Sequence, residues 1–424
     1  MAVNDSENQN FKSKVREKDK VTEYNMNQPT IVLHVVGRLD IGGAESRIMD
    51  LYRNIDREKV QFVFCQHTKD HCAFEEEVES LGGKVYHVPR FNVKNYFYYK
   101  KAWEDLFRNH PEIKVVQGHM TSTAAIYLPI AKKAGVEITI AHARSAGVDS
   151  GMKGYLTEFL RRNLYKKCDY RFTCSALAGE AVFGDQKVIS KKAVFIPNAI
   201  DVDKFQFNPE TRAQIRYELG LTEKFVIGHV GRFSHMKNHK YMLQILKQCI
   251  EIEKKERLSE TVLMFLGDGE LKEEIMEQAA AMGISSRVLF MGNKRDVYRY
   301  YQVMDYFLLP SLYEGLPGTA IEAQASGLPG IMSDTVTGEA VVTDLLQVRS
   351  IQEEPILWAE EIMKKNQELM QLSQESENIP EAGQTVETRR MDRASYARKV
   401  KEASFDVKEQ AKKMQEFYLT GKLM

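Results

Sequence analysis

The sequence predicts an α/β protein built from two Rossmann-like, doubly wound domains that face each other across a cleft. The chain has 424 residues, which at roughly 150 residues per domain suggests two or three domains. Hydrophobic residues make up 43% of the chain, so sizeable cores can form. From Thr30 onward, short apolar runs alternate with amphipathic stretches, which is typical of parallel sheets with helices on both faces.

The first predicted domain covers residues 30–200. Ile31–Val36 is an apolar run broken only by His34, which is typical of a strand buried on both faces. Repetition of the strand–helix alternation indicates a parallel sheet. The predicted strands are Ile31–Val36, Phe62–Gln66, Val85–Val88, Val115–Gly118, Ile138–His142, Arg171–Cys174 and Val194–Ile196. The predicted helices are Ala44–Asn54, Phe74–Leu81, Tyr99–Asn109, Thr123–Ala134, Gly154–Lys167 and Ala176–Phe183.

The second predicted domain covers residues 201–390 and follows a break in periodicity at Pro197–Asp201. Since the two units have similar size, the carboxyl ends of their strands are expected to open onto a shared cleft, where parallel sheets bind ligands. The predicted strands are Phe225–Val230, Val262–Leu266, Val288–Met291, Tyr306–Leu309 and Gly330–Ser333. The predicted helices are Thr211–Leu219, Tyr241–Ile252, Glu270–Met282, Asp296–Met304 and Thr319–Ser326.

The two ends of the chain differ from this pattern. Residues 1–29 are polar and are expected to form a disordered tail. Residues 391–424 are charged with a helical periodicity, and this segment is expected to pack back towards the first domain. Just before it, Glu353–Met370 is predicted to be a helix, and Gln371–Gln384 is predicted to be an exposed loop because it is polar and aperiodic.

Composition excludes several classes of protein. Lys and Arg number 59, as do Asp and Glu, and this zero net charge disfavours a nucleic-acid-coating protein. The five cysteines form no C-x-x-C pair, which disfavours a zinc ribbon or a disulfide scaffold: Cys65, Cys72, Cys168, Cys174 and Cys249. No signal peptide and no run of about 18 apolar residues occurs. The sequence therefore predicts a cytoplasmic protein, with peripheral contact at the inner face of the cell membrane left open.

The segment Pro310–Pro329 carries the densest chemical signal. A strand ends near Pro310, and a loop with two glycines leads into a helix that starts near Thr319. Free N–H groups at a helix start favour an anion such as a phosphate. Glu314 and Glu322 stand beside this site, where carboxylates suit hydroxyl groups better than phosphates. The combination indicates a ligand with a diphosphate and sugar hydroxyls, with ordinary solvated or capping glutamates as an equal alternative.

A second signal lies in Gly228–His239. A strand ends at Val230, and Arg232 and Lys237 follow in the next loop. A guanidinium and an ammonium near the cleft would neutralise a diphosphate and stabilise it as it departs. The three histidines of this loop leave zinc coordination as an alternative that lacks a fixed ligand spacing.

Glycine turns follow two other predicted strands. Gly42 and Gly43 precede a helix, and Gly267-Asp-Gly269 follows the strand that ends at Leu266. Such turns let the backbone approach a ligand. Neither is a G-x-G-x-x-G or G-x-x-x-x-G-K-[ST] loop, so nucleotide binding by those common loops is unsupported.

Together these segments resemble the family 4 retaining glycosyltransferases of the GT-B fold. The resemblance runs from about Ile31 to Tyr418 and includes the Gly-Gly-Ala-Glu turn, the Pro-Asn-x-Ile-Asp linker, Gly-Arg-(x)4-Lys, Gly-Asp-Gly and Glu-x7-Glu. The Asp334–Val348 region is most similar to the branch that acts in capsule and exopolysaccharide synthesis. The resemblance implies transfer of a sugar from a nucleotide sugar, with UDP expected, to a glycan or polyprenyl-linked glycan. It also implies retention of configuration, with no metal and no cofactor.

The resemblance implies roles for individual residues. Arg232 and Lys237 hold the diphosphate, Glu322 accepts hydrogen bonds from the ribose, and Glu314 contacts the transferred sugar. His119 matches a family histidine near the donor sugar, with a packed strand-end histidine as the alternative. The expected catalytic residues are Arg232, Lys237, Glu314 and His119. The expected donor-binding residues are Gly42, Gly43, Gly231, Gly267, Gly315, Leu316, Pro317 and Glu322. His142 and Arg144 follow the next strand as further candidates.

Three features of the sequence qualify the resemblance. The linker has Asn198-Ala199 where the family usually has Asn-Gly, and Ser333–Glu339 replaces a Gly-Gly turn and a Pro-Glu segment. The first change puts the expected hinge geometry in doubt. The second change puts in doubt the backbone contacts to the donor that are expected there. Asp201-Val-Asp203 has the DxD form of metal-dependent glycosyltransferases of another fold, but it lies in the linker, which disfavours a metal there.

The acceptor side shows one basic feature. An amphipathic helix is predicted around residues 153–167, and its basic residues are Lys153, Arg161, Arg162, Lys166 and Lys167. Such a surface is suited to anionic lipid, where polyprenyl-linked acceptors reside. A solvated helix packed on its own sheet explains the pattern equally well.

Two further functions stay open on the sequence. One is an epimerase of the same two-domain architecture acting on UDP-N-acetylglucosamine, which would use carboxylates as acid and base, whereas the Glu-x7-Glu context favours transfer. The other is a non-catalytic scaffold that binds a nucleotide sugar, which would be expected to have lost the key residues of the site. Here Arg232, Lys237, Glu314 and Glu322 are all present.

Overall fold

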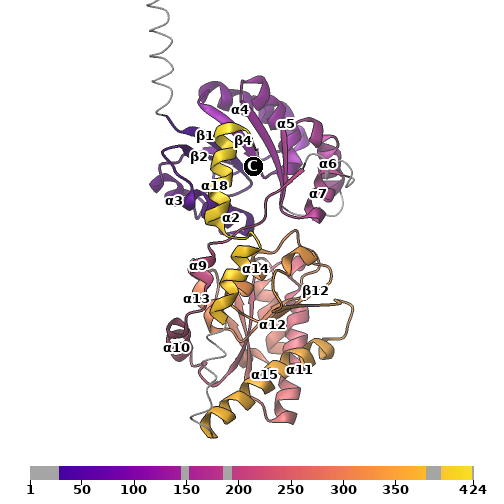
Figure 1. Ribbon diagram of the computed structural model, residues 1–424. Coiled ribbons are helices and arrows are strands. Elements are labelled where there is room, and N and C mark those ends of the chain that lie inside the picture. Colours follow the sequence, from indigo (N-terminus) through magenta and orange to yellow (C-terminus); the bar gives the residue numbers. More distant parts are fainter. Residues whose placement is uncertain (1–27, 145–151, 185–192, 379–392, 423–424) are drawn as a thin grey trace, which may run out of the picture.

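The structure is a computed structural model that describes residues 28–144, 152–184, 193–378 and 393–422. Two α/β domains lie one above the other along the long axis of the molecule (Figure 1). Residues 1–27, which make up most of the expected tail, lie outside the described residues.

The first domain contains a seven-stranded parallel sheet with the strand order β3-β2-β1-β4-β5-β6-β7. β1 is central and buried from Val32 to Val36, as its apolar run predicts. The strands are β1 (Thr30–Val36), β2 (Val60–Gln66), β3 (Val85–His87), β4 (Ile113–Gly118), β5 (Ile138–Ala143), β6 (Tyr170–Thr173) and β7 (Ala193–Phe195). The helices are α2 (Gly43–Asn54), α3 (Glu75–Ser80), η1 (Val93–Asn95), α4 (Tyr96–Asn109), α5 (Thr121–Lys133), α6 (Met152–Arg161), η2 (Leu164–Lys166) and α7 (Ala176–Phe183).

The second domain contains a six-stranded parallel sheet with the strand order β10-β9-β8-β11-β12-β13. Its strands are β8 (Phe225–Val230), β9 (Thr261–Leu266), β10 (Val288–Phe290), β11 (Tyr306–Leu309), β12 (Gly330–Ser333) and β13 (Leu346–Arg349). Its helices are α9 (Val202–Phe205), α10 (Pro209–Glu218), η3 (His235–Lys237), α11 (His239–Glu256), α12 (Lys272–Ala281), η4 (Ser285–Arg287), α13 (Val297–Val303), α14 (Gly318–Ala325), η5 (Gly338–Ala340) and α15 (Pro355–Asn378). The two sheets therefore repeat one doubly wound design, which is the predicted fold class.

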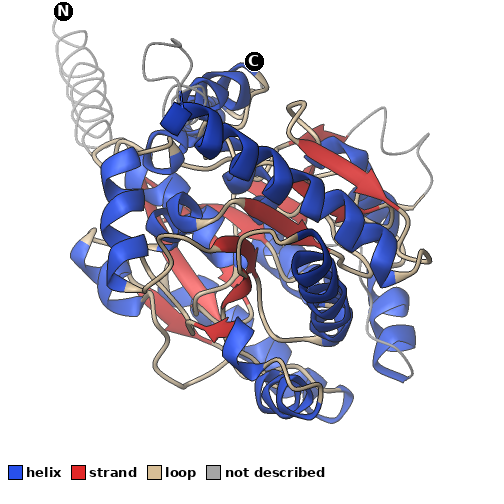
Figure 2. Ribbon diagram, turned by 90° about the horizontal axis from the view of Figure 1, so that it is seen from below, coloured by secondary structure: helices blue, strands red, loops and turns tan. Residues whose placement is uncertain are grey.

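Helices cover both faces of each sheet, so the apolar strand residues are enclosed (Figure 2). In the first domain, Tyr99 and Trp103 of α4 pack on one face together with Tyr127 of α5. On the other face, α2 packs beside α18 (Val407–Thr420), which comes from the far end of the chain. The core of the first domain is completed by these C-terminal residues.

The C-terminal segment crosses between the domains after η6 (Arg393–Ser395). α17 (Tyr396–Glu402) packs on α14 and α9 of the second domain, whereas α18, yellow in Figure 1, lies on the first domain. The turn between the two helices has Ser404 in the left-handed region with φ 69°. The hydroxyl of Tyr418 donates to Gln117 Oε1 at 2.6 Å, which fixes the end of the chain beside β4.

Three local predictions were wrong at their boundaries. β13 was not predicted, because it is a four-residue edge strand with two exposed positions, Gln347 and Val348. α15 continues to Asn378, whereas an exposed loop was predicted from Gln371, because its Gln and Glu residues favour helix even without an apolar stripe. α6 ends at Arg161 rather than continuing to Lys167, since Asn163 takes a left-handed conformation with φ 62°.

No helix in the described ranges is long and apolar enough to span a bilayer.

Candidate functional site

The expected site residues lie where the strand order of each sheet reverses. In the first sheet this point lies between β1 and β4, and in the second sheet between β8 and β11. His119 directly follows β4, Gly231 follows β8 and Pro310 follows β11. Doubly wound sheets bind ligands at the carboxyl ends of strands at such points. The topology therefore groups residues that are nearly 200 positions apart in the sequence.

Among the described residues, four polar contacts join residues 30–200 to residues 201–390, and the residues that make them define the interdomain interface. The Nη2 of Arg47 is 3.0 Å from Glu322 Oε1, and the side-chain amide of Asn198 donates to the Leu316 carbonyl at 2.8 Å. The backbone N–H of Ala176 donates to Glu339 at 3.2 Å, and Arg295 donates to the Ala73 carbonyl at 3.3 Å. Glu322, Leu316 and Glu339 thus lie against residues of the first domain.

The start of α14 is suited to bind an anion. Its N-cap is Pro317, and no side chain caps the free N–H groups of the first turn. Thr319 Oγ1 is buried in this turn and has no hydrogen-bond partner within the described ranges. A buried hydroxyl without a partner is costly, so this donor points to a ligand.

Lys237 and Glu314 form a buried ion pair that links the loops after β8 and β11. Ser311 Oγ also donates to Glu314 Oε1 at 3.0 Å. The backbones of the same loops are joined by the hydrogen bond from Leu312 N to Met236 O, 2.8 Å. The structure therefore brings the two predicted residues together and holds both by contacts within the second domain.

Arg232 lies apart from this pair. Its side chain is 75% exposed, and its Nε is 3.3 Å from Glu270 Oε2. An exposed pair of this kind contributes little to stability. The guanidinium is consequently free to change partner at small cost.

Glu322 is buried on α14 between two donors. Tyr301 donates its hydroxyl to Glu322 Oε2 at 2.8 Å, and Arg47 of α2 contacts the other carboxylate oxygen. Arg47 is also 3.1 Å from Asp50 on its own helix. Burial raises the pKa of Glu322 above its ordinary value, and the Arg47 charge opposes that rise. The predicted ribose acceptor is thus occupied by an arginine from the first domain.

His119 belongs to a buried group of histidines at the carboxyl ends of β1, β4 and β5. Arg144 Nε donates to His119 Nδ1 at 3.0 Å, so the proton of His119 sits on Nε2, which is 3.1 Å from His34 Nδ1. His142 stacks beside His119 with ring centroids 5.2 Å apart. Burial, followed by the nearby Arg144 charge, lowers the pKa of all three histidines, that of His34 to about 3. They are neutral at pH 7, and both ring nitrogens of His119 are engaged.

The predicted glycines shape the loops around the site. Gly267 has φ +139°, and a Cβ on it would lie 2.1 Å from the Gly231 carbonyl oxygen. The loops after β8 and β9 therefore approach so closely that only glycine fits. Gly43 opens α2, and a Cβ there would meet no atom within 4 Å, so this turn faces open space.

The segments that depart from the family pattern have structural partners. Thr335 Oγ1 donates to the Ser311 carbonyl at 2.7 Å, so the 333–339 segment supports the loop that carries Glu314. Asp203 of the DxD sequence pairs with Lys401 and Lys408, each at 2.5 Å. That acid therefore ties the linker to the C-terminal helices.

The zinc alternative concerns His229, His235 and His239, which lie at the end of β8 or after it. His229 and His239 are buried in a ring cluster, in which His239 stacks on Phe233 with ring centroids 4.1 Å apart. Among the residues that the structure describes, no three His, Cys, Asp or Glu side chains are grouped as a metal ion would need.

The roles of four residues in this region were not predicted from the sequence: Arg47, Asn198, Tyr301 and Thr319. Thr319 could have been found, since it occupies the first turn of the helix that the sequence predicted. The other three act through partners far along the chain, and only the tertiary structure reveals them.

Comparison with known proteins covers most of the chain. The family model described as Glycosyltransferase Family 4 matches residues 41–204, and the model described as Glycosyl transferases group 1 matches residues 211–386. EpsF of Bacillus subtilis strain 168, named as a glycosyltransferase, is 33% identical over 78% of this chain and 87% of its own length. The capsular polysaccharide biosynthesis glycosyltransferase CapH of Staphylococcus aureus is 24% identical over 84% of this chain and 96% of its own length.

The name of one further relative states its substrates. An Escherichia coli enzyme, UDP-Gal:alpha-D-GlcNAc-diphosphoundecaprenol alpha-1,3-galactosyltransferase, is 32% identical over 40% of this chain and 43% of its own length. Among solved structures, Anabaena HepE in complex with UDP has a TM-score of 0.68 at 16% identity, covering 92% of this chain and 99% of HepE. At this identity the likeness to HepE shows the fold alone.

Proposed function

The chain belongs to the family 4 glycosyltransferases, and on that premise we propose that it transfers a sugar from a UDP-sugar to a lipid-linked glycan acceptor. We propose further that transfer retains the anomeric configuration and needs no metal ion. The capsular relative and the relative that uses a diphosphoundecaprenol acceptor support exopolysaccharide or capsule synthesis as the context. The observation that carries the proposal is the uncapped start of α14, with its unpartnered Thr319 hydroxyl, beside the Lys237–Glu314 pair.

The donor diphosphate would bind at the start of α14. The free N–H groups and the Thr319 hydroxyl would donate to its oxygens, and the Lys237 ammonium would share its charge between Glu314 and the diphosphate. Arg232 would exchange its exposed partner Glu270 for the diphosphate. Glu314 and the backbone at Gly315–Pro317 would lie next to the sugar hydroxyls. No bound metal is needed for this charge balance, because protein cations and helix N–H groups face the diphosphate.

The transfer step follows from that arrangement. The bond between the anomeric carbon and the β-phosphate oxygen breaks, while the acceptor hydroxyl oxygen bonds to the same face of that carbon. The hydroxyl proton passes to a β-phosphate oxygen, so that UDP leaves with its new charge compensated by Lys237 and the helix start. The neutral, hydrogen-bonded ring of His119 is unsuited to accept this proton and would line the sugar side instead.

Ribose binding requires a change at Glu322. Its two oxygens are taken by Arg47 and Tyr301 in this structure. The ribose hydroxyls would replace Arg47 on Glu322, while Tyr301 stays in place. Donor binding and the contact between the two domains would therefore be coupled.

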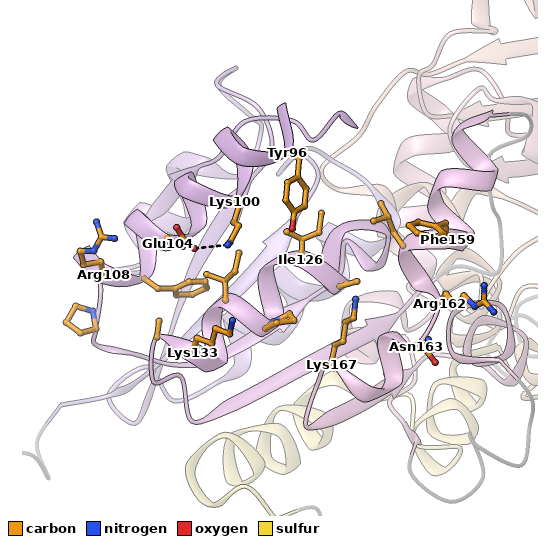
Figure 3. A pocket seen from close by; sticks show the side chains of 17 residues that line it. Tyr96, Lys100, Glu104, Arg108, Ile126, Lys133, Phe159, Arg162, Asn163 and Lys167 are labelled. Carbon is orange, nitrogen blue, oxygen red and sulfur yellow. Dashed lines mark ion pairs between the residues drawn. The ribbon is translucent and has the colours of Figure 1, made fainter. Parts of the chain in front are cut away.

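A groove of about 960 Å³ between α4, α5 and α6 supports membrane contact (Figure 3). Apolar side chains such as Phe107, Ile126 and Leu160 form part of its lining. Its rim carries the exposed Phe159 and the partly exposed Tyr96. Its basic lining residues are Lys100, Arg108, Lys133, Arg162 and Lys167, with Glu104 as the acidic one. We propose that this groove, which includes part of the predicted basic helix, rests on anionic lipid; the side chain of Lys153 lies outside the described residues.

The function is tested by incubating the protein with UDP-, GDP- and ADP-sugars and an isoprenyl-diphosphate-linked glycan, with and without EDTA. The proposal expects transfer from a UDP-sugar, an unchanged rate in EDTA, and a product whose anomeric configuration, read by NMR, equals that of the donor. An inverted product, or a rate abolished by EDTA, would contradict the corresponding part. Epimerised UDP-sugar would favour the epimerase, and binding without turnover across donors and acceptors would favour the scaffold.

The membrane contact is tested by co-sedimentation with anionic and neutral vesicles. The protein should bind vesicles that contain phosphatidylglycerol, and Lys133→Glu combined with Lys167→Glu should abolish that binding. A matched control is Lys364→Glu with Lys365→Glu, which reverses two charges on α15 away from the groove. Equal sedimentation of all three proteins would contradict the membrane proposal and leave sugar transfer untouched.

A further inference from the structure

Arg144 is a partly exposed arginine at the carboxyl end of β5, and no acidic partner lies beside it in the described structure. Its Nε donates to His119 Nδ1 at 3.0 Å and its Nη1 to Asn198 Oδ1 at 2.8 Å. Within the described ranges Arg144 forms no ion pair with a carboxylate, and the charge of Glu45 acts on it from farther away. The buried arginines Arg212 and Arg216, by contrast, share the carboxylate of Asp305.

The surroundings of Arg144 do not compensate its charge. Its histidine neighbours are neutral because burial lowers their pKa, and His142 and His34 each leave a buried Nε2 atom without a partner in the described chain. Asn198 offers only an amide oxygen. The Arg144 charge is partly removed from water and has no acidic partner in the described structure, so an anion beside it would be favoured.

Its position indicates which ligand would bring that anion. Asn198, which accepts from Arg144, donates in turn to the Leu316 carbonyl at 2.8 Å. Arg144 is thus two hydrogen bonds from the Gly315–Pro317 loop that leads into α14. Two of its five N–H groups are used in these hydrogen bonds, and the remaining three, on Nη1 and Nη2, suit phosphate oxygens.

We propose that Arg144 binds a diphosphate in the interdomain interface and is a further substrate-binding residue. This inference rests on the proposed function. The diphosphate belongs either to the nucleotide donor or to the isoprenoid-linked acceptor, because both ligands of the transfer reaction carry this group. In either case the first domain supplies a cation that faces the anion-binding start of α14.

The test compares Arg144→Gln and Arg144→Lys with the control Arg398→Gln. The side chain of Arg398 is 79% exposed and forms an ion pair with Glu402. Calorimetry measures binding of UDP and of farnesyl diphosphate, and NMR titration measures binding of uridine, which has no phosphate. We expect Arg144→Gln to weaken the binding of one of the two diphosphates by about 10- to 100-fold, because a charged hydrogen bond is lost. Arg144→Lys should fall between it and wild type, because a lysine keeps the charge and loses the guanidinium fork.

The two diphosphate probes distinguish the donor from the acceptor as the ligand of Arg144. A loss for UDP alone assigns Arg144 to the donor, and a loss for farnesyl diphosphate alone assigns it to the acceptor. Uridine binding should stay as in Arg398→Gln. Unchanged binding of both diphosphates would overturn the inference, as would equal loss for uridine, which would mark a structural role. If Arg144→Gln does not fold, the same criteria apply to Arg144→Lys. A wild-type protein that binds neither diphosphate would instead refute the proposed function, and the inference with it.

Discussion

The two sides of the interdomain interface are built in different ways. Within the second domain, Lys237 pairs with Glu314, and Asp305, just before β11, pairs with Arg212 and Arg216; Glu322 pairs across the interface with Arg47. On the first domain, Arg144 has no acid within ion-pair distance in the described chain, and Arg47 reaches across to Glu322. Apart from Glu322, the second domain therefore pairs these charges internally, whereas Arg144 of the first domain has no such partner in the described structure.

The strongest test of this comparison is Asp305→Asn. Asp305 accepts from both arginines of α10 and from Val226 N, and the two arginines hold the pKa of its carboxyl well below its ordinary value. Breaking such a buried pair should lower the free energy of unfolding by about 3–5 kcal/mol, measured by urea denaturation. Asp296→Asn is the control, because its pair with Arg299 is exposed at 3.5 Å and should be worth less than about 1 kcal/mol. Equal effects of the two changes would show that the second domain is not held by its buried pairs.

The next largest effect is expected for Lys237→Ala. Removing a preorganised cation from the diphosphate should reduce turnover on the order of 10²-fold or more, measured as kcat with a saturating UDP-sugar. Lys240→Ala removes an exposed lysine of the following helix, paired with Glu274 at 2.5 Å, and should leave kcat within about twofold. Full activity of Lys237→Ala would mean that the diphosphate binds elsewhere.

The bridge from the first domain is tested by Arg47→Gln. If ribose hydroxyls replace Arg47 on Glu322, removing this competitor should tighten UDP binding by about fivefold, the net value of one hydrogen bond near 1 kcal/mol. The control is Arg53→Gln on the same helix, because Arg53 pairs with Asp50 and Glu77 inside the first domain. Calorimetry would measure both. Weaker UDP binding in Arg47→Gln alone would show that Arg47 helps to hold the donor.

The smallest effect is expected on the pH dependence of stability, in which a histidine of the second domain is compared with one of the first. His239 stacks on Phe233, both its ring nitrogens lack partners in the described structure, and burial lowers its pKa to about 3. Below about pH 6.5 the imidazole of His239 takes up a proton in the unfolded chain but not in the folded chain. The free energy of unfolding therefore decreases as the pH is lowered, by up to about 1.4 kcal/mol per pH unit for this group. His239→Phe should remove that slope while keeping stability near neutral pH.

The matched measurement is urea unfolding at pH values of about 7, 6 and 5. His119→Phe should lose stability already at pH 7, because His119 bonds to Arg144 and His34. A slope in His239→Phe equal to that of wild type would contradict the assignment of His239 as a buried neutral group.

Much of the fold followed from local patterns. The central strands are continuous apolar runs between turn residues, so β1, β8 and β11 were found where the structure has them. The edge strand β13 and the end of α15 were not found, because exposed positions carry little hydrophobic signal. Glu314 and Lys237 were identified as site residues, but their pairing joins two loops 77 residues apart and has no local signature.

The sequence by itself determined the two doubly wound sheets, since apolar periodicity and glycine turns are local properties of the chain. It also placed the reactive residue types after particular strands. Only the tertiary structure decided which charges are compensated: Lys237 met Glu314, Arg47 met Glu322, and Arg144 met neutral partners alone. The physical reason is that burial and electrostatic pairing depend on distances between segments remote in the chain, which the order of residues does not fix.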